Sequence, residues 1–330
     1  MLFEGYLLEK GNIQLKYNRK NKPLFVDKST NVSYTTLHSK KRRMEFEIMI
    51  NKKTKIKIVA DSSADLLEMQ GIEFESVPLK ITTQEREYVD DCNVDIAEMA
   101  DYLLHYKGKS SSSCPNPSEW MEAFGDADCV FCIAITSKLS GSYNSACIAK
   151  NTYEKTYAGR RVFVIDSLSA GPELKLLAEK LRELICKGKD CEEIAVEIAK
   201  YQQKTGLLFA LESLNNFARN GRVSPVLAKA IGMLGIRLVG RASAEGTLEP
   251  LSKSRGEKRA LATLIEHLEK EGYGGGKLRI GHCFNEEAAQ VLAALVREKW
   301  SCSDVEIYQL RALCSFYAEK GGMLVGFEKN

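Results

Sequence analysis

Strand-like and helix-like segments alternate along most of this chain, and no other feature constrains the fold as strongly. Apolar runs typical of strands occur near residues 56–60, 73–79, 129–135, 161–165, 206–210, 278–282 and 304–308. Segments with the 3.6-residue apolar period of amphipathic helices lie between most of them. This order predicts an α/β protein with a parallel sheet flanked by helices. A length of 330 residues favours two domains over one.

The first 54 residues lack this alternation. They are polar and rich in Lys, Asn and Thr, so we interpret residues 1–54 as an N-terminal extension of the globular fold. Met44 lies shortly before the first strand, which suggests that residues 1–43 are an appendage or come from an upstream start. The basic run Lys40–Arg43 is interpreted as a solvated segment.

The charge balance argues against a nucleic-acid partner. The 47 basic and 44 acidic residues leave a formal charge of only +3, too little for a strong positive field. There is no signal-peptide pattern and no apolar run of about 18 residues, so we expect a cytoplasmic protein without stable membrane insertion. Transient contact with a membrane stays open.

Ten cysteines raise the question of a metal site or disulfides. Cys129 and Cys132 lie in an apolar run that a buried strand explains, and no second cysteine pair or histidine cluster completes a zinc site. We therefore expect reduced thiols, no metal and no cofactor.

The segment after the strand at 129–135 is the first candidate site, because ligands of open α/β sheets bind beyond the carboxyl ends of strands. It reads Thr-Ser-Lys-Leu-Ser-Gly-Ser from Thr136 and leads into a helix. Small residues at Ser140 and Gly141 allow close approach, and the free amides of a helix start favour an anion.

Two other interpretations of Ser140 stay open. It could be the nucleophile of a hydrolase with His282 as its base, although the Gly-x-Ser-x-Gly pattern is missing. Ser140 and Ser142 could also simply cap the helix.

A second serine cluster, Ser110–Ser113, precedes Cys114-Pro-Asn-Pro-Ser and a helix that carries Trp120. Such runs are common in flexible linkers. Here the prolines stiffen the segment, so an ordered loop whose hydroxyls hold a carboxylate or a phosphate is an equal alternative.

The remaining motifs give no evidence for a functional site. No phosphate-binding Gly-x-x-x-x-Gly-Lys-Ser/Thr loop or dinucleotide fingerprint occurs. Gly272 and the glycines 274–276 are interpreted as a helix-to-strand connection. Asp90 and Asp91 are interpreted as a solvated turn.

These segments together resemble the DegV family of bacterial fatty-acid-binding proteins, which includes the lipid-carrying subunits of fatty acid kinase. The resemblance runs from about residue 55 to the C-terminus. Its motifs are, in order, Val59-Ala-Asp-Ser-Ser-Ala-Asp-Leu, Ser112-Ser-Cys-Pro-Asn-Pro-Ser-Glu-Trp, Ile135-Thr-Ser-Lys-Leu-Ser-Gly-Ser-Tyr-Asn-Ser-Ala, Val164-Ile-Asp-Ser and Asn220-Gly-Arg-Val. Each motif alone is weak, but their common order is specific.

The resemblance implies a two-domain fold: an N-terminal α/β domain over residues 55–212 and a C-terminal α/β domain with a mixed sheet over residues 213–330. It implies a long-chain fatty acid between the domains, and a carrier rather than an enzyme, which presents the carboxylate to a partner kinase. A non-lipid interaction module is a further alternative.

The family roles fall on particular residues of this chain. The carboxylate site is expected at Ser112, Ser113, Ser140, Gly141 and His282. Arg222 and Arg255 are expected at the mouth of the site or on the kinase-docking face. The chain departs from the family where Ala312-Leu-Cys-Ser-Phe-Tyr replaces a His-Thr-Gly-Pro-Gly region.

Overall fold

The computed structural model describes residues 8–9, 12–13, 54–231 and 235–330. The chain forms two units, Met1–Lys53 and Thr54–Asn330. In the first unit, β1 (Leu8–Glu9) pairs antiparallel with β2 (Asn12–Ile13). The basic run Lys40–Arg43 and Met44 lie outside the described residues. All features below belong to the second unit.

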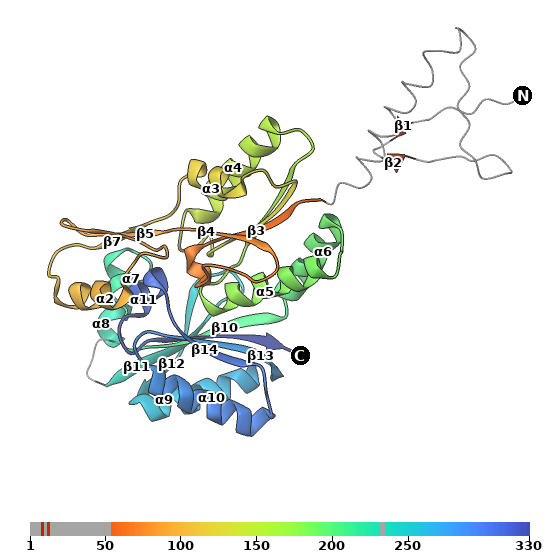
Figure 1. Ribbon diagram of the computed structural model, residues 1–330. Coiled ribbons are helices and arrows are strands. Elements are labelled where there is room, and N and C mark those ends of the chain that lie inside the picture. The colour runs from red at the N-terminus through yellow and green to blue at the C-terminus, as the bar shows by residue number, and fades with distance from the viewer. Residues whose placement is uncertain (1–7, 10–11, 14–53, 232–234) are drawn as a thin grey trace, which may run out of the picture. The chain divides into compact units, whose positions relative to one another are not determined.

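A parallel sheet forms the N-terminal half of the second unit, as the alternating pattern predicts (Figure 1). Its spatial order is β4 (Glu73–Val77), β3 (Ile56–Asp61), β8 (Cys129–Ala134) and β9 (Arg161–Asp166). Every neighbouring pair is parallel. Cys129 and Cys132 are buried in β8, in agreement with the strand interpretation.

Helices cover both faces of this N-terminal sheet. One face packs against α3 (Pro117–Phe124) and α4 (Ser142–Thr156), and the other against α5 (Pro172–Cys186) and α6 (Cys191–Gln202). Alternate residues of a strand point to opposite faces, so Ile58 contacts the α5–α6 layer and Val59 the α3–α4 layer. All six residues of β8 are buried because the strand is covered on both sides.

A mixed sheet of six strands forms the C-terminal half. Its order is β12 (Leu248–Arg255), β11 (Ile236–Ala242), β10 (Thr205–Leu211), β15 (Met323–Lys329), β13 (Tyr273–His282) and β14 (Val305–Gln309). Only β13 and β14 run parallel. The α/β class with a parallel and a mixed sheet is therefore confirmed.

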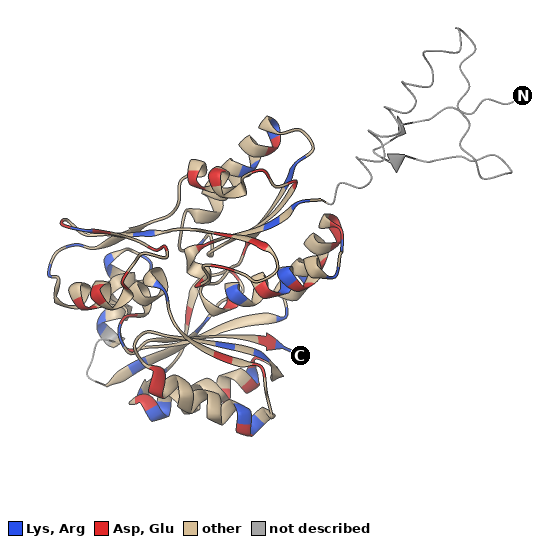
Figure 2. Ribbon diagram, viewed as in Figure 1, with Lys and Arg blue, Asp and Glu red and all other residues tan. Residues whose placement is uncertain are grey.

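Helices α9 (Glu257–Lys270) and α10 (Glu286–Trp300) cover one face of the mixed sheet. The opposite face packs against α7 (Asn215–Arg219), α8 (Pro225–Ile231) and α11 (Ala312–Ala318). Helix α5 contacts strands of both sheets, and Figure 1 shows it between them. Acidic and basic residues both occur on α6, α9 and α10, in keeping with the small formal charge (Figure 2).

The mixed sheet crosses the boundary that we drew at residue 212. β10 lies before that boundary, yet it pairs with β11 and β15. The chain from Thr54 to Asn330 is also one compact unit, so its division into two domains stays a prediction. No helix among the described residues is long and apolar enough to cross a membrane.

Several strands were missed in the sequence analysis. β11 and β12 carry Arg, Lys and Pro, and Pro250 is tolerated because β12 is an edge strand. The glycines 274–276 were misinterpreted, because they lie inside β13. There the register against β15 shifts between Tyr273 and Leu278, so the run is a strand irregularity rather than a connection.

A small antiparallel sheet stands beside the N-terminal half. It contains β6 (Glu87–Val89), β5 (Lys80–Thr82) and β7 (Ser111–Ser113), and α2 (Ile96–His105) and α11 pack near it. The second serine cluster is thus an ordered strand and not a linker. Asp90, which follows β6, was also misinterpreted: it is fully buried and accepts hydrogen bonds from the start of α11.

Candidate functional site

An apolar cavity of about 300 Å³ lies between the carboxyl end of the N-terminal sheet and the face of the mixed sheet that α7 and α11 partly cover. The floor comes from alternate residues of β10, because Leu207, Phe209 and Leu211 share one side of the strand. Their neighbours Leu208 and Ala210 face the opposite core, beneath α9 and α10. Because side chains alternate along a strand, β10 contributes one set of residues to the cavity wall and the other set to the core.

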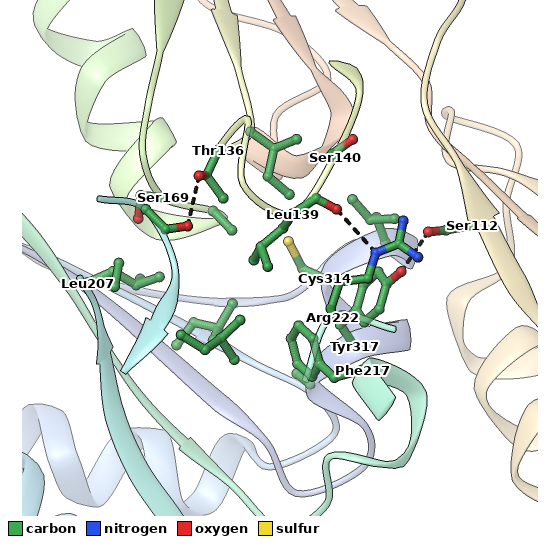
Figure 3. A pocket seen from close by; sticks show the side chains of 18 of the residues that line it. Ser112, Thr136, Leu139, Ser140, Ser169, Leu207, Phe217, Arg222, Cys314 and Tyr317 are labelled. Atoms are coloured by element: carbon green, nitrogen blue, oxygen red, sulfur yellow. Dashed lines mark hydrogen bonds between the residues drawn. The ribbon is translucent and has the colours of Figure 1, made fainter. Parts of the chain in front are cut away.

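One end of the cavity is polar. Ser112 and Ser113 from β7, and Ser140 and Gly141 from the segment before α4, all line it. Four of the five predicted carboxylate-site residues thus come together, although β7 and α4 are far apart in the sequence. Arg222 also lines the cavity and donates from Nε to the carbonyl of Leu139 over 3.1 Å (Figure 3).

The start of α4 provides amides with no side-chain cap from the N-cap residue Gly141. Ser140 Oγ accepts from the Ser142 amide over 3.2 Å, as the capping interpretation predicts. The same hydroxyl also lines the cavity and keeps its own proton to donate. Ser140 therefore caps the helix start and faces the cavity, and its role in holding a carboxylate stays a prediction.

Asp61 fixes the turn between β8 and α4 by hydrogen bonds. Its fully buried carboxylate accepts from Ser142 Oγ over 2.6 Å and from the Ile135 amide over 2.9 Å. Burial raises the pKa of Asp61, and these hydrogen bonds oppose that rise. The end of β3 thereby fixes the path of the chain from β8 into α4.

The structure does not bring His282 to the cavity. Its side chain is buried at the end of β13, where Nδ1 accepts from the Asn285 amide over 3.3 Å. Burial lowers the pKa of His282. Because His282 does not line the cavity with Ser140, a Ser140–His282 hydrolase pair is not assembled. The expected head-group contact of His282 has no support in this geometry.

Arg255 is also away from the cavity. It ends the edge strand β12 and is exposed. Neither Arg222 nor Arg255 forms an ion pair with any residue that the structure describes. The two arginines therefore occupy different places, one in the cavity wall and one on the surface.

Tyr317 also lies at the cavity, although no sequence motif predicts it. Its hydroxyl lies 2.7 Å from Ser112 Oγ at the polar end of the cavity, and Phe217 packs on its ring (Figure 3). Burial raises the pKa of Tyr317, so the phenol keeps its proton. The only signal in the sequence was that Tyr317 belongs to the segment that departs from the family pattern.

The turn between β11 and β12 forms another part of the cavity wall. Thr136 Oγ1 donates to the carbonyl of Gly246 over 2.8 Å, and both residues line the cavity. Gly246 has a φ of +84°, and a Cβ there would lie 2.3 Å from Thr136 Oγ1. Only glycine permits this approach.

An apolar cavity that presents hydroxyls, an arginine and a helix start at one end defines an α/β protein suited to bind an amphipathic molecule with an anionic or polar head. The family model of DegV family proteins matches residues 55–330. The chain belongs to the DegV family.

Relatives and solved structures agree with this assignment. A DegV domain-containing protein of Streptococcus pneumoniae is 42% identical over 276 residues, which cover 82% of this chain and 98% of the relative. A DegV family protein of Eubacterium eligens, solved with heptadecanoic acid, is 44% identical with a TM-score of 0.82, covering 83% of this chain and all of the other. The Streptococcus pneumoniae fatty acid kinase (Fak) B3 protein, solved with linoleic acid, is 41% identical with a TM-score of 0.82. The match covers 84% of this chain and 100% of the other.

Proposed function

We propose that this protein binds a long-chain fatty acid in the cavity, with the carboxylate at the polar end. The observation that carries the proposal is the joining of an apolar cavity with Ser112, Ser140 and the start of α4 at one end. The likeness to DegV proteins solved with heptadecanoic and linoleic acids supports it.

The apolar wall and the polar end have different tasks in this proposal. Burying an acyl chain of about sixteen carbons at about 0.8 kcal/mol per CH₂ contributes on the order of 10 kcal/mol. A desolvated carboxylate needs hydrogen bonds to offset its lost water. The hydroxyls of Ser112, Ser140 and Tyr317 and the amides of the α4 start would provide them, so the wall gives affinity and the polar end gives orientation.

Ser112 and Tyr317 would act as a pair. In a hydroxyl pair one oxygen donates and the other accepts, so one proton stays available to the ligand. Arg222 adds positive charge nearby, since its guanidinium is bound only to backbone carbonyls among the described residues. These groups favour an ionised head over an ester.

We further propose that the protein presents the bound carboxylate to a fatty acid kinase and has no catalytic role itself. Its likeness to the fatty acid kinase (Fak) B3 protein supports this partner. The exposed Arg255 is a candidate contact on the partner-facing surface. Arg222 would then lie at the mouth of the cavity.

Denaturing mass spectrometry of an organic extract of the purified protein tests the proposed ligand directly. We expect fatty acids in the extract at close to one per protein chain. A non-lipid interaction module would yield none, and that result would remove the proposal.

The double variant Ser112→Ala with Ser140→Ala tests the assigned end of the cavity. After delipidation, it should bind palmitic acid at least tenfold more weakly than the wild type, because losing two hydrogen bonds to a charged group costs about 3 kcal/mol. Its melting temperature without ligand should fall by only a few degrees, because the Ser142 amide loses its acceptor. Unchanged affinity would move the carboxylate elsewhere.

A further inference from the structure

Helix α11 connects the two halves of the second unit. Leu313, Cys314 and Tyr317 from this helix line the cavity. Near its carboxyl end, α11 is hydrogen-bonded to α7: Asn216 Nδ2 donates to the carbonyl of Phe316 over 2.7 Å. The position of α11 therefore decides where the Tyr317 hydroxyl lies relative to Ser112.

Two buried aspartates from the N-terminal half hold the start of α11. Asp65 Oδ1 accepts from the Arg311 amide over 2.9 Å. Asp90 accepts from the Ala312 amide over 3.1 Å and from the Leu313 amide over 3.0 Å. The first amides of a helix have no partner inside the helix, so these carboxylates satisfy three donors that would otherwise be buried and unpaired.

The arginine before the helix adds to this contact. Arg311 Nη2 lies 3.3 Å from Asp90 Oδ1 and also donates to the carbonyl of Asp91. Asp90 is fully buried, so its charge depends on these donors. We call Asp65, Asp90 and Arg311 the α11 clamp.

The clamp is close to the cavity wall. A Cβ placed on Gly171 would lie 3.4 Å from Asp65 Oδ2, 3.6 Å from the Cys314 sulfur and 3.0 Å from Leu324. Cys314 and Leu324 both line the cavity. A shift of Asp65 would therefore also move Cys314 and Leu324, which line the cavity.

From this geometry we infer that Asp65 and Asp90 are positioning residues of the ligand site: they fix the start of α11 and thereby hold Tyr317 against Ser112. The inference rests on the proposed function, because it concerns the same carboxylate site. Neither aspartate lines the cavity, so neither touches the ligand.

A double-mutant cycle separates positioning from a general effect on stability. Asp90→Asn, Tyr317→Phe and the double variant are made in the full chain and delipidated. Palmitic acid affinity is then measured by displacement of a fluorescent fatty acid. Asp91→Asn is the matched control, because among the described residues the Asp91 side chain accepts hydrogen bonds only from Asn93.

We expect Asp90→Asn to weaken binding by about three- to tenfold, and no more than Tyr317→Phe does. In the Tyr317→Phe background the same change should cost less than about twofold, because the group that Asp90 positions is gone. Asp91→Asn should bind like the wild type. Equal losses in both backgrounds, or no loss in either, would overturn the inference.

A second variant covers the case in which Asp90→Asn does not fold. Asp65→Gly removes the acceptor of the Arg311 amide, and glycine adopts the φ of 55° at this position without strain. It should show the same dependence on Tyr317, and hydrogen exchange should be faster at the start of α11. A wild type that binds no palmitic acid would instead overturn the proposed function, which is a distinguishable result.

Discussion

Single side chains in this protein owe their role to neighbours that are distant in the sequence. Ser112 and Tyr317 are 205 positions apart, and their hydroxyls meet at 2.7 Å. Asp65 and the Arg311 amide are 246 positions apart and form a bond of 2.9 Å. The chemistry at the polar end of the cavity therefore depends on contacts between segments rather than on any one motif.

Tyr317→Phe should weaken fatty-acid binding roughly tenfold, because it removes one hydrogen bond from a pair that serves a charged head. The ring remains and keeps its packing on Phe217, so thermal stability should hardly change. Comparing palmitic acid with its methyl ester measures the effect. The neutral ester should lose less affinity than the carboxylate, because a hydrogen bond to an uncharged carbonyl contributes less. An equal loss for both ligands would contradict the assigned role.

Asp65 predicts a dependence of stability on pH. Burial raises its pKa from 3.8 to about 7, and Asp90 adds to the rise while the Arg311 amide opposes it. Tyr308 and Cys314 are the other titratable groups that face Asp65. Between about pH 4 and pH 7 the folded protein binds more protons at this site than the unfolded chain, so this contribution to stability is present at low pH and is lost as the pH rises.

Asp65→Asn should remove that contribution. The asparagine oxygen can still accept from the Arg311 amide, and asparagine tolerates the positive φ. As the pH rises through this range, the free energy of unfolding of the variant should increase relative to that of the wild type by up to about 1.4 kcal/mol per pH unit. Urea unfolding at several pH values measures the difference, and parallel curves for the two proteins would show that Asp65 does not titrate there.

At the scale of elements, the cavity is closed by pieces that do not belong to the sheets. Helix α11 lines the cavity through Leu313, Cys314 and Tyr317. The turn between β11 and β12 lines it through Gly246, whose carbonyl accepts from Thr136 Oγ1. Such connections tolerate change poorly where the backbone has a positive φ and a close neighbour. Gly246 meets both conditions.

Gly246→Ala should lower the free energy of unfolding by about 2 kcal/mol, because the alanine is strained at positive φ and its Cβ meets Thr136 Oγ1. Gly159→Ala is the matched control: its φ is +88°, yet nothing lies within 4 Å of the added Cβ. It should cost only about 1 kcal/mol. Chemical denaturation measures both variants. Equal losses in the free energy of unfolding would show that an added Cβ at residue 246 does not clash with Thr136.

For the whole molecule, ligand binding and stability are linked. A ligand that binds only the folded state stabilises it by about 2.7 kcal/mol at one hundred times its dissociation constant. We expect palmitic acid to raise the melting temperature of the delipidated protein by several degrees. Scanning calorimetry measures this, and Ser112→Ala with Ser140→Ala should show a smaller shift at the same ligand concentration.

Much of the fold could be predicted from the sequence, because the apolar runs of β3, β8, β9 and β10 are short and bounded. The positions of Ser112, Ser113, Ser140 and Gly141 at the cavity could be predicted as well. Ser140 and Gly141 follow a strand end, Ser112 and Ser113 precede a proline-stiffened segment, and all four match family motifs. Asp90 could not: a pair of aspartates in a loop is typical of solvated turns, and only the start of α11, more than 200 residues later, buries it.

The sequence by itself determined the alternation of strands and helices, the N-terminal parallel sheet and the family, because periodicity and local motifs act over short distances along the chain. Tertiary structure alone decided which polar groups share a cavity: it brought Tyr317 to Ser112, left His282 outside and buried Asp65 and Asp90 at the start of α11. The physical reason is that these contacts depend on how the packed halves meet, and burial then sets the hydrogen bonding and pKa of each group.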